Sequence, residues 1–268
     1  MTFRTALITG ASSGIGMAFA RNLPRATNLL LTGRNHEKLV GLASELALNG
    51  REVRTVTADL ATAEGRHAVI GAAGDAGIDL LINNAGLGRI GRVIDNTEER
   101  EAEMVQVNIV AAAELTRALL PGMLKRAHEL QQGAAQQAGT PQRCGIIFVA
   151  SSAAFMPLPY FATYAASKAF LLHYAEALSE ELSHDPVDVL ALCPGATETQ
   201  FFTRAGVERP SFTTLHSAER VAREGLQMLG QRSVHVVGPT NYLTSLVSRF
   251  LPRGWVTYAA ERVMREWK

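Results

Sequence analysis

Two kinds of segment alternate along this chain. Short runs of apolar residues, most of them unbroken, are separated by longer stretches in which apolar residues recur every three or four positions. An unbroken apolar run is typical of a strand covered on both faces, and the longer period is typical of an amphipathic helix. The strands predicted in this way are Ala6–Thr9, Leu29–Thr32, Val53–Thr57, Leu80–Ile82, Ile146–Ala150, Val187–Leu192 and Val234–Val237, and the clearest helices are Gly14–Leu23, Glu37–Asn49 and Glu98–Ala127.

The alternation of strand and helix predicts an α/β fold, a Rossmann-like doubly wound parallel sheet of about seven strands with helices on both faces. No Pro/Gly-rich linker divides the 268 residues, so one domain over 1–268 is expected. The Gln/Ala/Gly-rich stretch Gln131–Arg143 is interpreted as a surface insertion without a functional role.

The longest stretch without charge or histidine is Cys144–Ser167. Its length would allow a membrane span, but Pro157 and Pro159 would leave backbone groups unsatisfied in lipid. A buried segment of a globular fold is therefore expected, and no transmembrane segment.

Bulk composition narrows the function classes. A formal net charge of +1 gives no indication of a nucleic-acid partner, and two cysteines provide neither a disulfide framework nor metal-ligand spacing. Two thiols fit a reducing compartment, so a cytoplasmic protein is expected. The first residues run directly into an apolar strand, and no signal-peptide pattern is predicted there.

The C-terminal tail carries apolar residues at helical spacing, namely Val256, Ala259, Ala260, Val263 and Trp267. The favoured interpretation is a helix packed on its own domain or on a partner subunit. The alternative is a helix at a membrane surface or a lid over an apolar substrate.

A glycine-rich turn, T-G-A-S-S-G-I-G at Thr9–Gly16, follows the first strand and opens the first helix. Such a turn lets the backbone approach a pyrophosphate and presents helix N–H groups to it, while nearby serines add donors. A dinucleotide site is predicted on Gly10, Ser12, Ser13, Gly14, Ile15 and Gly16.

The ribose-selecting position follows the second strand in L-L-L-T-G-R-N. Gly33 stands where an acid would favour NAD(H), and the next residue is Arg34. A guanidinium can bind a 2′-phosphate, so NADP(H) is the preferred cofactor and NAD(H) the alternative.

Tyr164 and Lys168 are spaced i, i+4 and share one face of a helix predicted over Thr163–His184. A neighbouring ammonium lowers the pKa of a phenol, and a cationic nicotinamide ring adds to this effect. Such a tyrosine can give a proton to a carbonyl oxygen or take one from an alcohol.

Three further motifs occur in order along the chain: N-N-A-G at Asn83–Gly86, Asn108 in V-Q-V-N, and P-G-A-T-E-T at Pro194–Thr199. Together with the glycine-rich turn and the tyrosine–lysine pair, they make the chain resemble the short-chain dehydrogenase/reductase family from about Thr5 to Thr199. The resemblance implies Tyr164 as acid/base, Lys168 on the nicotinamide ribose and Asn108 in the proton relay. It further implies cofactor contacts from Asp59, Leu60, Asn83, Ala85, Gly86, Pro194, Gly195, Thr197 and Thr199. It also implies a homodimer or homotetramer, with a substrate loop and helical region within residues 200–268.

The serine doublet Ser151–Ser152 leaves a choice. In the family the catalytic serine usually lies thirteen positions before the tyrosine, which selects Ser151 and leaves Ser152 as the alternative. A shift of one residue on an extended chain would reverse which side chain faces the site. The expected role is a hydrogen bond to the substrate oxygen.

The substrate is expected to be a small molecule, a ketone or aldehyde and the corresponding alcohol. Apolar residues that could line its pocket are Phe155, Met156, Leu158, Pro159, Tyr160, Phe161, Phe201, Phe202 and Phe212, although an ordinary core role is an even alternative. The rival functions are a non-catalytic dinucleotide-binding redox sensor and an epimerase or dehydratase that uses the same tyrosine.

Overall fold

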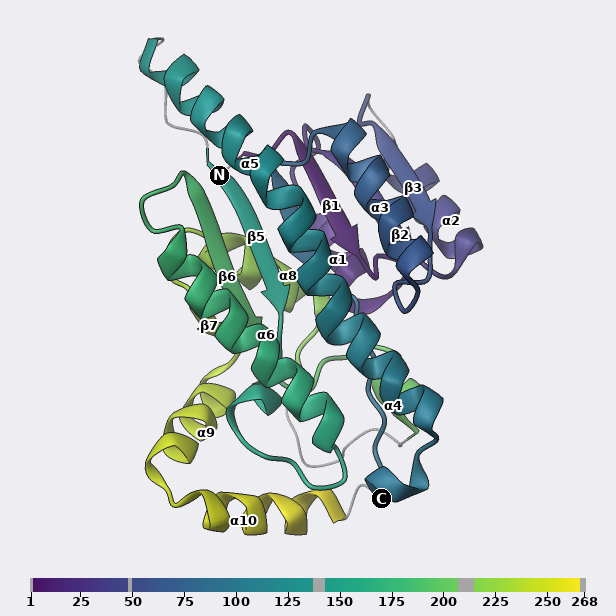
Figure 1. Ribbon diagram of the computed structural model, residues 1–268, viewed down its shortest axis with the longest axis vertical. Helices are drawn as coiled ribbons and strands as arrows, with labels where there is room; N and C mark the ends of the chain where they lie inside the picture. The colour runs from purple at the N-terminus through teal and green to yellow at the C-terminus, as the bar shows by residue number, and fades with distance from the viewer. Residues whose placement is uncertain (1, 48–49, 137–142, 207–214, 266–268) are drawn as a thin grey trace.

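The computed structural model describes residues 2–47, 50–136, 143–206 and 215–265. Seven parallel strands form one sheet in the order β3-β2-β1-β4-β5-β6-β7 (Figure 1). The chain thus moves outward in one direction, returns to the centre after β3 and continues in the other. The strands are β1 Thr5–Thr9, β2 Asn28–Gly33, β3 Val53–Thr57, β4 Leu80–Asn83, β5 Cys144–Val149, β6 Val187–Cys193 and β7 Val234–Val236.

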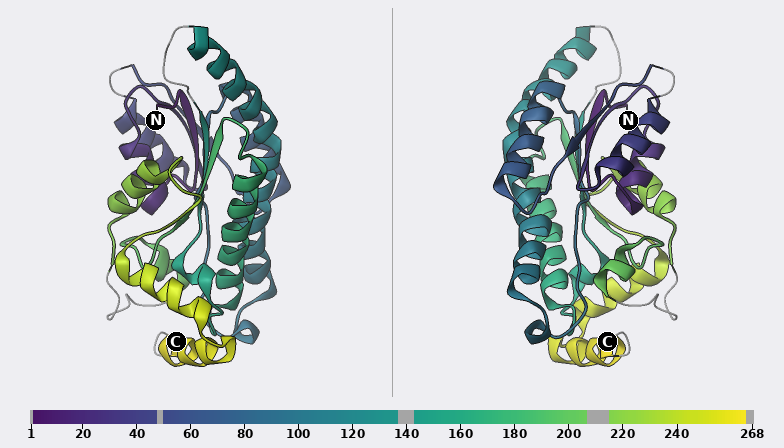
Figure 2. Two further views of the ribbon diagram at one scale, coloured as in Figure 1. Left: turned by 90° about the vertical axis from the view of Figure 1, so that its left-hand side faces the viewer. Right: turned by 90° about the vertical axis from the view of Figure 1, so that its right-hand side faces the viewer.

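Helices cover both faces of the sheet, which gives three layers (Figure 2). One face packs against α3 (Ala63–Ala76), α5 (Ala111–Gln136) and α6 (Ala162–Glu181). The other packs against α1 (Gly14–Asn22), α2 (His36–Leu46) and α8 (Ala218–Met228).

The unbroken apolar strands follow from this burial. In β1, Leu7 belongs to the core under α3 and α5, whereas Ala6 and Ile8 belong to the core under α1 and α8. Successive side chains point to opposite faces, so a strand with two covered faces needs an apolar residue at every position. The predicted doubly wound sheet is confirmed.

The long predicted helix Glu98–Ala127 is longer and less regular than expected. It comprises α4 (Glu98–Val105), a π-helical turn at Gln106–Val110, and α5, which continues to Gln136. The stretch interpreted as an insertion from Gln131 to Arg143 therefore begins as the last turns of α5, and residues 137–142 lie outside the described part.

The uncharged run forms three elements of the globular fold rather than one span. It is divided among β5, the 3₁₀ turn Ser152–Phe155 and the first residues of α6. By length and composition, one helical stretch of the described residues, Glu98–Gln132, would be apolar enough to cross a membrane. It packs on the sheet instead, since Leu115 and Met123 belong to the main core.

The C-terminal region adds α7 (Phe201–Ala205), α9 (Pro239–Phe250) and α10 (Arg253–Arg265). Both α9 and α10, yellow in Figure 1, run below the end of the sheet rather than along a face. The predicted apolar face of the tail is partly wrong. Val256 and Ala260 are buried together with Met264, but Ala259 and Val263 are exposed, and Trp267 lies outside the described residues.

Candidate active site

A cleft of about 1120 Å³ opens at the carboxyl ends of the strands, between the sheet and the helices α4, α6 and α7. Ligands of open α/β sheets bind at this edge, where the strand order reverses. The predicted residues that line it are Gly10, Ser12, Ser13, Gly14, Ile15, Arg34, Asp59, Leu60, Ala85, Gly86, Ser151, Tyr164, Lys168, Pro194, Gly195, Thr197 and Thr199.

The glycine turn is packed too tightly for side chains. Gly10 and Gly14 have φ of 66° and 57°, in the left-handed region. A Cβ on Gly16 would lie 2.5 Å from the Gly10 carbonyl oxygen, and one on Gly14 would lie 2.9 Å from Thr199. The backbone can therefore come close to a ligand at this point.

The N-terminus of α1 differs from those of three other helices. Asn35, Thr62 and Ser217 accept a backbone hydrogen bond at the starts of α2, α3 and α8, whereas the Ser13 side chain makes no capping bond. The first N–H groups of a helix need a partner and attract anions. The donor set at this turn thus fits the phosphates of a dinucleotide.

Gly33 and Arg34 stand where the sequence predicts ribose selection. A Cβ on Gly33 would lie 3.1 Å from Ser12 Oγ, so that hydroxyl occupies the space of a side chain. Arg34 reaches across the cleft to α4, where its Nη1 lies 2.6 Å from Glu103 Oε1. The guanidinium is half-exposed and lines the cleft beside Ser12.

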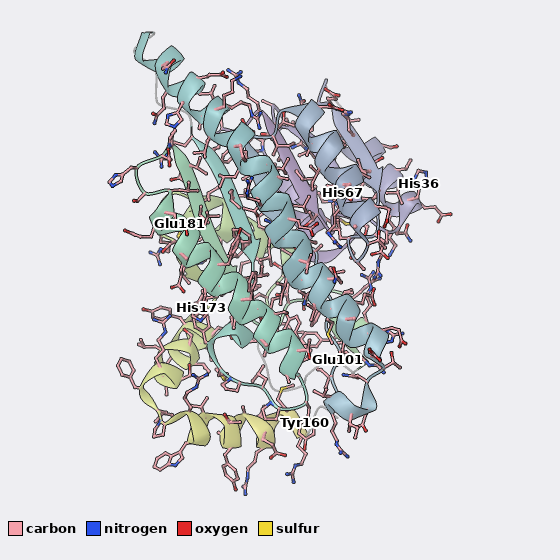
Figure 3. All side chains as sticks on the ribbon, viewed as in Figure 1. His36, His67, Glu101, Tyr160, His173 and Glu181 are labelled. Atoms are coloured by element: carbon pink, nitrogen blue, oxygen red, sulfur yellow. The ribbon has the colours of Figure 1, made fainter. Side chains whose placement is uncertain are left out.

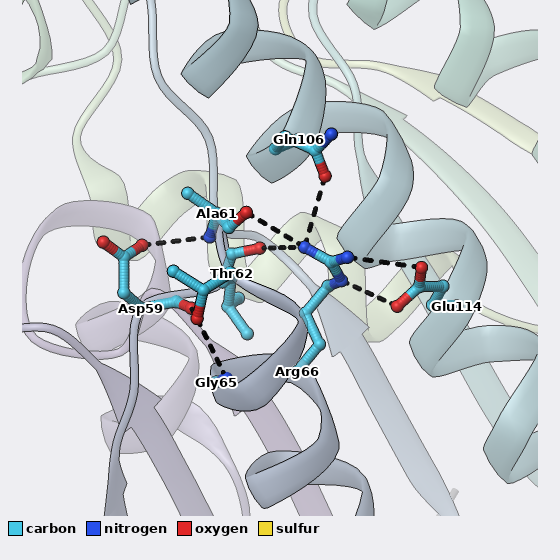
Figure 4. Close-up of polar contacts among 8 residues, drawn as sticks. Asp59, Ala61, Thr62, Gly65, Arg66, Gln106 and Glu114 are labelled. Carbon is cyan, nitrogen blue, oxygen red and sulfur yellow. Dashed lines mark hydrogen bonds and ion pairs between the residues drawn. The ribbon is translucent and has the colours of Figure 1, made fainter. Parts of the chain in front are cut away.

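Asp59 and Leu60 are positioned by an arginine that the sequence did not single out. Arg66 of α3 is buried and donates to the carbonyl oxygens of Leu60 and Ala61, both at 3.1 Å (Figure 4). It also pairs with Glu114 of α5 at 2.6 Å. A buried cation is costly unless all its donors are paired, and this pairing fixes the loop that forms the cleft wall.

In the N-N-A-G motif, the neighbour of the predicted asparagine faces the cleft. Asn83 does not line it; its amide nitrogen donates to Thr116 Oγ1 of α5 at 3.0 Å within the core. Asn84 lines the cleft and donates to the Thr9 carbonyl oxygen at 2.7 Å, which ties the β4 loop to the glycine turn. Asn84 rather than Asn83 therefore lines the cleft, because residues at the end of a strand alternate between its faces, and the contact of Asn83 with a cofactor stays a prediction.

Tyr164 is buried on the first turn of α6, with Ser151 within hydrogen-bonding range. Burial raises the pKa of the phenol to about 12, and the Ser151 hydrogen bond offsets only part of this. Desolvation of the phenolate thus sets the direction of this shift, and a lower pKa through Lys168 and a bound nicotinamide stays a prediction.

Lys168 lies one turn further along α6 and is buried as well. Its Nζ donates to the Val149 carbonyl oxygen at 2.8 Å and lies 5.7 Å from the centre of the Tyr164 ring. Burial lowers the pKa of the ammonium to about 8. The tyrosine and lysine predicted from i, i+4 spacing thus share one buried surface of the cleft.

Asn108 lies in the π-helical turn and is fully buried. Its Oδ1 accepts from the Leu87 N–H at 2.8 Å, and its Nδ2 donates to the Leu87 carbonyl oxygen and to Ser167 Oγ, both at 2.9 Å. The side chain therefore holds the β4 loop against α6. Its place is beside the cleft rather than in its lining.

The serine doublet is not symmetric. Ser151 lines the cleft and caps the 3₁₀ turn, accepting from the Ala153 N–H at 3.1 Å. Ser152 is absent from the lining, and its N–H donates to the Pro194 carbonyl oxygen at 2.8 Å. The structure places Ser151 beside Tyr164, as the thirteen-residue spacing predicts.

The P-G-A-T-E-T segment is fixed by the C-terminal helices. A Cβ on Gly195 would lie 2.2 Å from Asn241 Nδ2 of α9. The backbone around Thr197 pairs with that of His216 ahead of α8. Asn241 and His216 are positioning residues that no motif indicated.

An aromatic wall closes the end of the cleft beside Tyr164. Phe161 stacks on Tyr164 with ring centres 4.2 Å apart, and Phe201 of α7 lies 5.2 Å from the same ring. Phe201 lines the cleft, whereas Phe155, Met156, Leu158, Pro159, Tyr160, Phe161 and Phe202 do not, and Phe212 lies outside the described residues. Leu158, Tyr160 and Phe161 pack in the cluster that backs this wall, whereas Phe155 packs against the main core.

The loop before α6 is held by contacts at the lower end of the molecule, where Figure 3 labels Tyr160 and Glu101. Tyr160 has φ of 63°, unusual for a non-glycine residue, and its hydroxyl lies 3.0 Å from Glu261 of α10. Glu101 of α4 accepts from Thr163 Oγ1 at the start of α6. Three elements therefore converge on the turn that carries Tyr164.

Comparison with known proteins identifies the family. The short chain dehydrogenase model matches residues 4–209. This chain belongs to the short-chain dehydrogenase family. It is accordingly an NAD(P)-dependent dehydrogenase/reductase, in agreement with its Rossmann-like sheet and the cleft described above.

One relative and two solved structures illustrate the similarity. A very-long-chain 3-oxoacyl-CoA reductase from Mycosarcoma maydis is 29% identical over 97% of this chain and 74% of its own. A short-chain dehydrogenase from Sphingobium yanoikuyae in complex with NADPH has a TM-score of 0.74 and 28% identity, covering 92% of this chain and 93% of its own. A bulky-bulky ketone specific alcohol dehydrogenase from Comamonas testosteroni has a TM-score of 0.71 and 26% identity over 93% of each chain.

Proposed function

We propose that this enzyme interconverts a hydrophobic ketone or aldehyde and its alcohol with NADP(H), using Tyr164 as the acid/base. The observation that carries the proposal is a buried tyrosine that Ser151 and Lys168 approach in the cleft, with an aromatic wall beside it. The similar proteins named for a 3-oxoacyl-CoA and for bulky ketones support an apolar carbonyl substrate.

The protonation of Tyr164 suits the role of an acid in reduction. When bound, the nicotinamide supplies the hydride for reduction or accepts it in oxidation. A pKa of about 12 keeps the Tyr164 phenol protonated at neutral pH, ready to donate to a carbonyl oxygen. The Ser151 hydroxyl is placed to stabilise charge on that oxygen, and the Lys168 ammonium to stabilise the phenolate that remains.

The mechanism is tested with Tyr164→Phe. NADPH consumption on a panel of bulky ketones should fall about 10²–10⁴-fold, the usual contribution of general acid catalysis, while NADPH binding by fluorescence is kept. Tyr174→Phe is the matched control, because that ring lies on the same helix and packs between Phe148 and Phe170. Turnover that survives in Tyr164→Phe would refute the role of Tyr164, and NADPH binding without turnover of any carbonyl would favour a redox sensor.

The preference for NADPH rests on Arg34 and Ser12, which border the cleft where no carboxylate follows β2. Arg34→Ala should weaken NADPH binding about 10-fold or more and leave NADH binding almost unchanged, because only the former carries the 2′-phosphate. Arg54→Ala, at an exposed position on β3 outside the cleft lining, is the control. Equal losses for both cofactors would contradict the assignment.

We further propose that the enzyme works in the cytoplasm, where its two free thiols would stay reduced, and that it forms a homodimer or homotetramer, as the family resemblance implies. Light scattering on the purified protein tests the assembly, and a monomer at all concentrations would refute it.

A further inference from the structure

The outer side of α9 and α10 is an exposed apolar surface. Of thirteen large hydrophobic side chains exposed in the described residues, nine lie between positions 242 and 263, so they form a cluster rather than a scatter. Phe250 is 82% exposed and Trp255 71%. We call the following set the outer face: Tyr242, Leu243, Leu246, Val247, Phe250, Leu251, Trp255 and Tyr258.

Helical spacing aligns these residues. Tyr242, Leu246 and Phe250 follow each other at i, i+4, i+8 on α9. On α10, Trp255 and Tyr258 lie opposite the stripe of Val256, Ala260 and Met264 that packs inward. Figure 2 shows both helices at the lower boundary of the molecule, and Figure 3 shows side chains that point outward from them. A clustered apolar surface of this kind marks an interaction site.

The charges carried by α9 and α10 are predominantly positive. Residues 239–265 contain four arginines and a single carboxylate, Glu261. Glu261 is directed to Tyr160 and to Arg265, and is thus neutralised on the inner side of α10. Arg262 lies over the Tyr258 ring at 5.0 Å. Arginine beside tryptophan, tyrosine and phenylalanine is the pattern of helices that lie in the interface of an anionic bilayer.

Pairing with a second copy is disfavoured by the same charges. A two-fold contact places the same patch of both subunits face to face, so the arginines of one copy would meet those of the other. Like charges brought together in this way are repelled, whereas anionic headgroups would be attracted.

We infer that the outer face binds the surface of an anionic lipid bilayer. The inner side of α10 points to a consequence, because Met264 packs in the same cluster as Phe161 and Tyr164. A bilayer bound at the outer face would lie at the substrate end of the cleft, within reach of carbonyl compounds dissolved in lipid. This consequence rests on the proposed function, whereas bilayer binding itself does not.

The test is vesicle flotation of the full chain with phosphatidylcholine alone and with added phosphatidylglycerol. Flotation is expected only with the anionic lipid and should weaken at 1 M salt, where the screening length falls to about 3 Å. Phe250→Ser with Trp255→Ser should reduce the bound fraction by about 10-fold or more, as expected for the loss of two buried aromatic side chains. Val40→Ser, which removes an exposed side chain on α2, should leave it unchanged.

A second variant guards against loss of folding. Arg253→Gln with Arg262→Gln keeps every apolar residue and should remove the preference for the anionic lipid, with NADPH binding unchanged. Wild type that fails to float with anionic vesicles at low salt would overturn the inference. The inference would also be overturned if wild type did not bind the vesicles and the serine variants converted an oligomer into a monomer. Flotation without turnover would refute the proposed function alone.

Discussion

The two halves of the cleft are built by different means. The cofactor half consists of backbone turns in close contact, as where Gly16 lies against Gly10 and Asn84. The substrate half consists of side chains from distant segments, as where Phe201 lies beside Tyr164 and Glu261 reaches Tyr160 across 101 positions. Backbone geometry of the first kind is encoded locally by glycine, but the second kind exists only after the chain has folded.

Tyr164 and Lys168 lie between the two halves, and their properties depend both on local sequence and on distant segments. Their i, i+4 spacing is local, but burial by elements far along the chain sets their pKa values to about 12 and about 8. The same pair of residues on an exposed helix would titrate near their ordinary values. The chemistry of the site therefore depends on the packing around the pair.

In the cofactor half, even a single added methyl group should disturb the fold and cofactor binding. Gly16→Ala places a Cβ 2.5 Å from the Gly10 carbonyl oxygen and should cost about 1–3 kcal/mol of unfolding free energy and abolish NADPH binding. Urea unfolding and cofactor titration measure both. Gly41→Ala on α2, where nothing lies within 4 Å, is the control. A Gly16→Ala protein that binds NADPH normally would contradict the backbone description.

The stability of the protein should depend on pH in a way that reveals the buried ammonium of Lys168, which lies between the two halves. The folded pKa of Lys168, about 8, lies below its ordinary 10.5, so below pH 8 its ammonium costs stability. That cost is relieved as pH rises from 8 toward 10.5. Lys168→Met should therefore be more stable than wild type at pH 7, by about 1–3 kcal/mol, with the difference narrowing by pH 10. Parallel stability curves for the two proteins over this window would refute the buried ammonium.

The substrate half should respond to packing without affecting the cofactor. Met264→Ala removes side-chain volume behind Phe161 and Tyr164, and should cost about 1–2 kcal/mol and raise KM for a bulky ketone severalfold. The dissociation constant of NADPH should not change. Val263→Ala, at the adjacent half-exposed position, is the matched control. A loss of NADPH affinity equal to the change in KM would mean that the halves are not separable.

The smallest change in stability is expected at a glycine whose conformation and surroundings would accept a side chain. Gly254 lies at the start of α10 with nothing within 4 Å, so Gly254→Ala should stabilise the protein by about 0.5 kcal/mol through helix propensity. Gly77→Ala should instead lower the midpoint of thermal unfolding. Its φ of 63° is strained for alanine even though no atom lies within 4 Å of the added Cβ. Destabilisation by Gly254→Ala would show a contact that the structure does not contain.

Prediction from the sequence succeeded where the pattern is local. All seven strands were predicted, because a strand buried on both faces is apolar at every position. Helix α3 was not singled out, since its Ala/Gly-rich sequence has little apolar periodicity. The end of α5 resembles a surface loop in sequence, because a polar Gln/Ala composition suits a projecting helix as well as a loop.

The direction of a side chain could not be predicted from spacing. Asn84 rather than Asn83 lines the cleft, and Ala259 and Val263 of α10 are exposed, because spacing gives the period of a side-chain pattern but not its direction. Arg66, His216 and Asn241 had no motif at all. Each acts by holding a loop that another element brings to it.

The sequence by itself determined the parallel sheet, the glycine turn after β1 and the candidate pair Tyr164 and Lys168. These features depend on residue type and short-range spacing. Only the tertiary structure decided that Asn84 rather than Asn83 faces the cleft, that Arg34 spans to Glu103, and that α10 backs the aromatic wall. Those outcomes depend on which distant surfaces pack together, because burial, and with it the pKa of each buried group, is a property of the whole fold.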